Sequence, residues 1–190
     1  MKNLIVYAHP HTKSFCNSIT KTLTQSLTPG TFMVRDLYAL NFNPVFSANE
    51  LKEFYEAKVS AETLKEQEYI KKAKTLTFIY PIWHAGPPAI LKGYWDRILT
   101  RGFAYDFGRH GLMGLLKDKK AALIRTQGAS KEDYESIYWP AMNVASSELM
   151  KKYGMEVIFN KYFPSVATVS EKVRAGYLED VKEFAKMINV

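Results

Sequence analysis

The sequence predicts an α/β fold, a doubly wound five-stranded parallel sheet with strand order 2-1-3-4-5 and helices on both faces. Short β-branched and aromatic runs alternate with longer segments of helical periodicity along the chain. The length of 190 residues suits one well-buried domain, and no repeat, low-complexity tract or linker divides it. We therefore expect a single domain over residues 1–190.

Five segments are predicted to be strands because apolar, β-branched and aromatic residues cluster in them. In chain order they are KNLIVYA (2–8), FMVRDL (32–37), TLTFIY (75–80), AALIRT (121–126) and EVIFNKY (156–162). Pro29-Gly30 forces a turn before the second strand.

The predicted helices show apolar residues every three or four positions, as Ile19, Leu23 and Leu27 do. In chain order they cover residues 14–27, 48–55, 61–73, 89–99, 140–153 and 170–188. Gly154 is a common helix stop, and Ser170 is a suitable N-cap for the last helix.

The charge, the cysteine content and the apolar runs of the chain exclude several classes of protein. The net charge of +7 comes largely from lysines interleaved with glutamates, as in LKEQEYIKKAK, which is typical of solvated helix faces. No nucleic-acid-binding signature accompanies the charge, so we expect no nucleic-acid partner. Cys16 is the single cysteine, and the apolar run at residues 4–8 is too short for a signal peptide or a membrane span. These features favour a cytoplasmic protein.

The predicted strand order indicates where a ligand would bind. In this order the chain leaves strands 1 and 3 in opposite directions, which opens a crevice at the carboxyl edge of the sheet. The loops that follow those strands are His9 to Lys13 and Pro81 to Pro88. We expect both loops to line the crevice.

The first of these loops suits a phosphate group. Neither G-x-G-x-x-G nor G-x-x-x-x-G-K-[ST] occurs, which argues against a dinucleotide-binding Rossmann half and a P-loop. The segment HPHTKSFCNS instead brings Thr12, Ser14 and Asn17 to a helix start, where hydroxyl and backbone N–H groups can hold a phosphate. Alternatively, Ser14 serves only as the N-cap of this helix.

The second loop suits a planar ring. Trp83 offers a flat apolar surface, and prolines restrict the loop before a ligand binds. The segment RTQGAS, Arg125 to Ser130, follows strand 4 as a third candidate wall. A phosphate cradle and an aromatic wall at one sheet edge suggest a ligand like flavin mononucleotide. The alternative is that Trp83 is a core residue.

Four motifs resemble the NAD(P)H:quinone oxidoreductase family of flavodoxin-like proteins, which includes small bacterial reductases and ancillary subunits of potassium efflux systems. They are AHPHTKSF, DLYALNFNP, PIWHAGPPAILKGYWDR and GFAYDF. The resemblance extends from Lys2 to about Tyr134. It implies a flavodoxin-like fold, a flavin cofactor, two-electron reduction by NAD(P)H, and a homodimer with its sites at the subunit interface.

The resemblance also assigns residues to the site. The flavin phosphate and ribityl chain would contact His9, Ser14, Phe15, Cys16 and Asn17. The flavin ring would lie along Pro81, Ile82, Trp83, His84 and Ala85, and it would be bordered by Thr126, Gln127, Gly128 and Ala129. Tyr105 and Tyr134 would line the pocket for nicotinamide and acceptor.

The chain departs from the family pattern at several of these positions. Family members often have asparagine at the position of Cys16, an aromatic residue at that of His84, and a glycine pair at that of Gly128-Ala129. Some quinone reductases also have a pocket histidine that has no equivalent near Pro140. These departures bear more on the quinone assignment than on the flavin assignment.

Several of these residues also have simpler interpretations. His84 could be an ordinary loop histidine, and His9 with His11 lacks further ligands for a metal site. Cys16 is expected to be small and buried, although a helix N-terminus would lower the pKa of its thiol. His110 stands in a glycine-punctuated segment that is expected to be a loop, and it receives no role.

The predicted activity is hydride transfer from NAD(P)H through FMN, or alternatively FAD, to quinones or similar small electron acceptors by a ping-pong mechanism. The alternative is a flavin-binding regulatory subunit that docks on a potassium efflux transporter in the membrane. A one-electron carrier is disfavoured because such carriers tend to be acidic.

Overall fold

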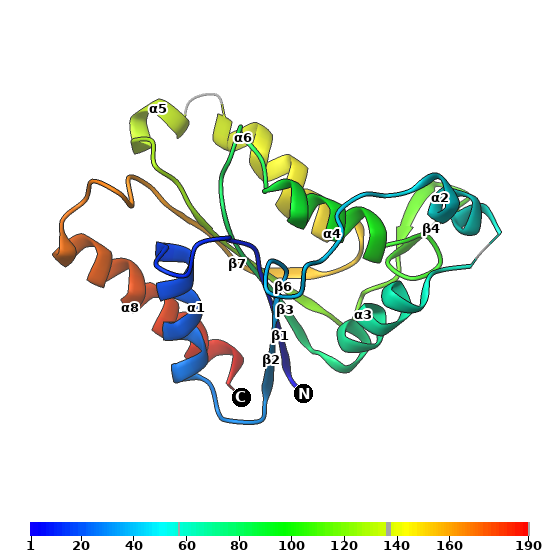
Figure 1. Ribbon diagram of the computed structural model, residues 1–190, viewed down its shortest axis with the longest axis horizontal. Coiled ribbons are helices and arrows are strands. Elements are labelled where there is room, and N and C mark those ends of the chain that lie inside the picture. Colours follow the sequence, from blue (N-terminus) through cyan, green and yellow to red (C-terminus); the bar gives the residue numbers. More distant parts are fainter. Residues whose placement is uncertain (57, 136–137, 190) are drawn as a thin grey trace.

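The computed structural model describes residues 1–56, 58–135 and 138–189. Its main sheet has five parallel strands in the order β2-β1-β3-β6-β7, which confirms the predicted order 2-1-3-4-5 (Figure 1). The strands are β1 (Asn3–Tyr7), β2 (Phe32–Asp36), β3 (Thr75–Pro81), β6 (Lys120–Thr126) and β7 (Glu156–Phe163).

Helices cover both faces of this sheet, as predicted (Figure 1). One face carries α1 (Phe15–Ser26) and α8 (Glu171–Ile188), and the other carries α3 (Ala61–Lys72), α4 (Ala89–Ile98) and the helical segment over residues 138–152. Side chains along each strand alternate between the two cores, so that Ile5 packs with the first layer and Leu4 and Val6 with the second. No helix of the described residues is long and apolar enough to cross a membrane.

The helical segment expected over residues 140–153 contains a π-helical turn. It consists of α6 (Tyr138–Asn143), η1 (Val144–Glu148) and α7 (Leu149–Lys152). Its start lies two residues before the expected one, because Pro140 falls within the first turn, where the missing N–H costs no helical hydrogen bond.

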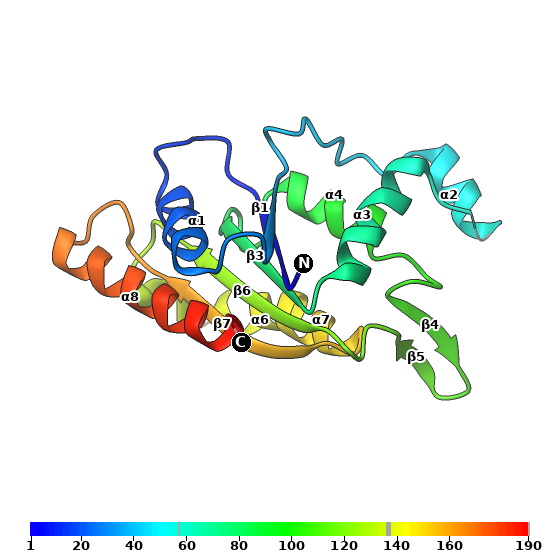
Figure 2. The same cartoon turned by 90° about the horizontal axis from the view of Figure 1, so that it is seen from below.

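A β-hairpin and a short helix were not predicted. The hairpin joins β4 (Tyr105–Gly108) to β5 (Gly111–Gly114) and lies apart from the main sheet (Figure 2), and α5 (Lys131–Glu135) follows β6. His110 lies in the hairpin turn. The loop expected around His110 is therefore confined to this turn, and strands stand on both sides of it. The hairpin escaped prediction because its exposed strands lack the apolar alternation of a half-buried sheet.

Arg97 holds the long connection after β2 against α4. Its guanidinium is almost completely buried and donates to Glu50 Oε1 at 2.6 Å and Glu62 Oε2 at 2.7 Å. A third hydrogen bond, at 2.5 Å, reaches the carbonyl oxygen of Asn43. Burial alone would raise the pKa of Glu50, but hydrogen bonds from Ser47 and Arg97 lower it. The start of α2 (Ala48–Tyr55) is thereby tied to α4 and α3.

Gly93 brings the same connection into close contact with α4. A Cβ atom at this position would lie 2.2 Å from the carbonyl oxygen of Pro44. Only a residue without a side chain therefore permits this helix–loop packing. Much of the sequence resemblance in NFNP and ILKGYWDR thus reflects packing around Gly93 and Arg97.

We expect Gly93→Ala to destabilise the protein by about 1–3 kcal/mol, because the added methyl group overlaps backbone atoms of Pro44. Urea denaturation would measure the free energy of unfolding. Gly176→Ala is the matched control, since Gly176 is also helical but a Cβ atom there would have no other atom within 4 Å. The control should gain up to about 1 kcal/mol from helix propensity, and equal stability of the two variants would contradict the packing argument.

Candidate functional site

Three loops meet at the carboxyl edge of the sheet, after β1, β3 and β6. The chain continues from β1 into α1 on one face and from β3 into α4 on the other (Figure 1). The predicted reversal of chain direction is therefore present between these neighbouring strands, and it brings the loops over residues 8–14, 82–88 and 127–130 to the edge of the sheet where the expected crevice lies.

The first wall of this crevice is the start of α1. Ser14 is its N-cap and accepts a hydrogen bond from the Asn17 backbone N–H at 3.2 Å. The Asn17 side chain in turn donates to the carbonyl oxygen of Thr12, which fixes the preceding loop. No acidic residue stands in the first helical turn, so no carboxylate there offsets the positive end of the helix dipole. Ser14 thus fulfils its capping role while the geometry also suits an anion.

His9 stands in the loop before this helix, and a hydrogen bond fixes the orientation of its ring. Its Nδ1 accepts the backbone N–H of His11 at 3.0 Å, and His11 Nδ1 accepts that of Lys13 at 3.0 Å. Burial, and then the neighbouring His11, lower the pKa of His9. A neutral His9 consequently carries its proton on Nε2, which is a donor for a ligand.

The second wall is a tight turn over residues 83–86. Trp83 and Gly86 exchange two backbone hydrogen bonds of 3.0 Å, and the two residues between them have positive φ, 47° at His84 and 59° at Ala85. This pair of angles corresponds to a type I′ turn, which L-residues other than glycine and asparagine adopt only under strain. The turn is held to the sheet by the Ile82 N–H, which donates to the Thr126 carbonyl oxygen at 2.8 Å.

Trp83 is not a core residue. Its side chain is 41% exposed, and its ring centroid lies 5.9 Å from that of His9 at an interplanar angle of 60°. The alternative interpretation of Trp83 as part of the core is therefore wrong. Its ring is available as a wall of the crevice, next to the donor of His9.

The third wall follows β6. Thr126 and Gln127 are buried, and the Gln127 backbone N–H donates to the Phe163 carbonyl oxygen at 3.0 Å. The Gln127 Oε1 atom is buried and has no hydrogen-bond partner among the described residues. Gly128 is exposed, and a side chain there would meet no atom within 4 Å. This loop therefore leaves open space beside an unused acceptor.

Cys16 is fully buried, as expected from its size, and lies 3.1 Å from Thr126 Oγ1. The expected lowering of its pKa is wrong. Burial raises the pKa of the thiol to about 12, and this effect outweighs the hydrogen bond with Thr126. Only the backbone of Cys16 is thus in a position to serve a ligand.

Arg125 begins the segment predicted as the third wall, but its side chain is a buried cation. It is fully buried, donates to Ser146 Oγ at 3.3 Å and to Asn160 Oδ1, and its guanidinium lies 4.7 Å from the Trp139 ring centroid. Ser146 belongs to the π-helical turn, so this turn brings a hydroxyl to the arginine. The sequence could have indicated this hydrogen-bond network, because an arginine inside an apolar strand needs buried polar partners.

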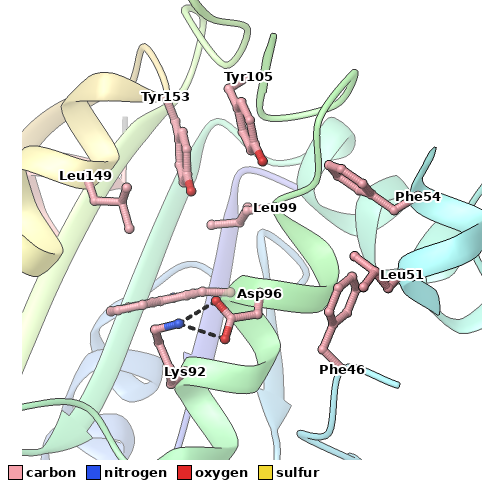
Figure 3. A pocket seen from close by; sticks show the side chains of 10 residues that line it. Phe46, Leu51, Phe54, Lys92, Asp96, Leu99, Tyr105, Leu149 and Tyr153 are labelled. Carbon is pink, nitrogen blue, oxygen red and sulfur yellow. Dashed lines mark hydrogen bonds and ion pairs between the residues drawn. The ribbon is translucent and has the colours of Figure 1, made fainter. Parts of the chain in front are cut away.

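Tyr105 does not join the three loops within one chain. It stacks on Tyr153 with ring centroids 5.4 Å apart and an interplanar angle of 12°. Both rings line a separate cavity of about 260 Å³ between α4, α7 and the hairpin (Figure 3). Its predicted place in the nicotinamide pocket stays a prediction. The side chain of Tyr134 lies outside the part of the structure that is described.

The floor of this cavity contains features that sequence reasoning missed. Lys92 Nζ and Asp96 Oδ2 form an ion pair of 2.7 Å, and Phe46, Leu51 and Phe54 make the opposite wall (Figure 3). The buried Trp95 Nε1 has no hydrogen-bond partner among the described residues. The aromatic pair Tyr94-Trp95 was part of the motif, but no sequence pattern indicated that one of its members would line a cavity.

Comparisons with known proteins agree with the fold and with the motifs. A family model described as a flavodoxin-like fold matches residues 1–184. An uncharacterized NAD(P)H oxidoreductase of Haemophilus influenzae is 32% identical over 184 residues, which cover 94% of this chain and 91% of the relative. An NAD(P)H:quinone oxidoreductase from Methanothermobacter marburgensis superimposes with a TM-score of 0.84 at 26% identity, over 98% of this chain and 96% of the other.

A more distant structure shares the fold. It is an FMN-dependent NADH-azoreductase from Bacillus anthracis in complex with FMN, with a TM-score of 0.79 and 17% identity over the whole of both chains. The family match and the relatives establish what the motifs had suggested: the chain belongs to the flavodoxin-like family of NAD(P)H:quinone oxidoreductases.

Proposed function

We propose that this oxidoreductase uses a flavin to transfer two electrons from NAD(P)H to quinones or similar small acceptors. The observation that carries the proposal is the exposed Trp83 ring, which stands on a strained turn beside His9. FMN is the proposed cofactor and FAD the alternative. The relatives named as NAD(P)H oxidoreductases, and the FMN bound to the azoreductase of the same fold, support the proposal.

The residues present fit such a cofactor. The start of α1 lacks acidic side chains and would receive the phosphate. Trp83 would lie along the ring system, and the buried Gln127 Oε1 would accept a hydrogen bond from a ligand hydroxyl or ring N–H. The space beside Gly128 gives room for the ring border, since no described atom lies within reach of a Cβ there.

A bound flavin would supply the hydride chemistry, and the chain would position and polarise it. The backbone N–H groups of His84 and Ala85 donate to no described carbonyl group, so they are available to negative charge that develops on the ligand. His9 Nε2 and Tyr134 are further proposed donors. NAD(P)H and acceptor would each stack on the exposed face of the flavin in turn, which would give ping-pong kinetics.

We also propose that the protein is a homodimer. Figure 2 shows α2 and the hairpin at one end of the molecule. Large apolar side chains are exposed on these two elements and on the connection before α2. They are Leu40, Val45, Phe46, Leu51, Tyr55, Phe107, Leu112, Met113 and Leu115. Such a surface favours a protein interface. A second copy seated there would cover the cavity of Figure 3 and would allow Tyr105 to reach the crevice of its partner.

The activity itself is directly testable. Protein loaded with FMN or FAD should catalyse steady NAD(P)H-driven reduction of menadione, with parallel lines in double-reciprocal plots because both substrates use one site in turn. A preparation that stays colourless with both flavins would contradict the proposal. Negligible turnover until a transporter is added would favour the regulatory subunit instead.

Trp83→Ala should weaken flavin binding by roughly two- to twelve-fold, since an aromatic contact is worth about 0.5–1.5 kcal/mol beyond buried area. Fluorescence titration of the apoprotein would measure this affinity. The stability of the apoprotein should change little, because the side chain is partly exposed.

The matched control is Trp95→Ala, which removes a buried indole from the core and should cost about 3–5 kcal/mol of stability. If Trp83→Ala instead lowered stability to the same extent and left flavin affinity unchanged, Trp83 would have no role as a flavin wall.

Light scattering should give a mass of about twice 21.8 kDa. Phe107→Glu should shift the protein toward monomer, because it places a charge on a side chain that is 61% exposed in the proposed interface. Val173→Glu is the control, since Val173 is 41% exposed on α8, in the other helix layer. A monomeric wild-type protein at all working concentrations would exclude the proposed dimer.

A further inference from the structure

Four lysines surround a depression at the amino edge of the sheet, at the opposite end from the three loops. The depression has a volume of about 470 Å³ and is lined by Lys2, Lys72, Lys74 and Lys120, with Met1, Asn3, Thr75, Met187 and Ile188. Both ends of the described chain lie at this edge (Figure 1). The depression is therefore separate from the proposed flavin site.

The backbone under these lysines is held by the sheet. The Lys74 N–H donates to the Lys2 carbonyl oxygen at 2.7 Å, and the Lys120 N–H donates to that of Lys74 at 2.9 Å. The neighbouring Lys119 is buried, and its Nζ donates to the Lys71 carbonyl oxygen at 2.8 Å, which ties the end of α3 to the start of β6. The four side chains thus project from fixed positions.

Their charges are only partly balanced by nearby carboxylates. None of the four forms an ion pair with a described residue, and no aspartate or glutamate lines the depression. Asp118 is paired with Lys119 at 2.9 Å and also attracts Lys74, and Glu68 attracts Lys72, but both carboxylates stand outside the lining. Glu156 stands opposite Lys120 in the strand register, outside the lining.

Helix dipoles account for only part of this cluster. Lys72 lies in the last turn of α3, where a cation stabilises the helix end. Lys2, Lys74 and Lys120 instead stand just before or at the start of strands β1, β3 and β6, and strands carry little net dipole. A concave site with several ammonium groups and no carboxylate favours a compact anion of several charges.

We propose that this depression binds an oligophosphate, either free or as part of a nucleotide. The lysines would contact phosphate oxygens, and their flexible side chains suit tetrahedral groups in several orientations. Met187 and Ile188 provide an apolar wall against which a nucleotide base could lie. The volume lies within the usual range for small ligands.

Isothermal titration of the flavin-loaded protein with inorganic tripolyphosphate tests the proposal, and a second titration with a nucleoside triphosphate distinguishes the free from the nucleotide-borne form. Lys74→Gln/Lys120→Gln should weaken binding of tripolyphosphate by about 30-fold, which is about 2 kcal/mol at 1.4 kcal/mol per tenfold. Binding to wild-type protein should also weaken as salt is added.

The control is Lys21→Gln/Lys65→Gln, which removes the same charge from two exposed helix positions outside the depression. It should change the affinity by less than about twofold, and circular dichroism and flavin affinity should match the wild type in both double variants. Equal losses in both pairs, or no binding to wild-type protein at low salt, would overturn the proposal. Tighter binding of a single-stranded oligonucleotide than of either phosphate would replace it with a nucleic-acid surface.

Discussion

The buried guanidinium of Arg97 is the interaction on which the side of the molecule around α4 depends. It joins Glu50, Glu62 and the Asn43 carbonyl oxygen, and so fixes the long connection after β2 on α4. Removal of either carboxylate would leave a buried charge with fewer partners, which is far more costly than loss of an exposed ion pair. The same helix carries the Trp83 turn before its first residue and the Figure 3 cavity along its length, so its position sets the geometry of both.

The fold was predictable where burial requires apolar residues at regular spacing along the sequence. The three central strands β1, β3 and β6 are largely buried, mostly apolar runs, and alternation of strands with helices leaves few arrangements of a parallel sheet. The hairpin over residues 105–114 has no such period because none of its residues is buried and most are exposed. The π-helical turn could not be predicted from the sequence either. It brings Ser146 to Arg125, and these two residues are far apart in the sequence.

The sequence predicted which loops form the candidate site, but not the surroundings of every side chain in it. Strand order brought His9, Trp83 and Gln127 to one edge, and the cap at Ser14 followed from local sequence. The pKa of Cys16 was predicted with the wrong direction because the depth of the thiol beneath Thr126 is a tertiary property. Tyr105 lies on the hairpin, stacked on Tyr153, and its assigned place in the nicotinamide pocket stays a prediction.

The backbone of the turn over residues 83–86 is an independent argument for function at this edge. Positive φ at two consecutive residues that are neither glycine nor asparagine costs about 1–3 kcal/mol each. A glycine at His84 or Ala85 would relieve that strain without loss of the two Trp83–Gly86 hydrogen bonds. The strained residues support little of the core, because both side chains are exposed. The strained conformation holds Trp83 beside His9, and the backbone N–H groups of His84 and Ala85 donate to no backbone carbonyl group of the described residues.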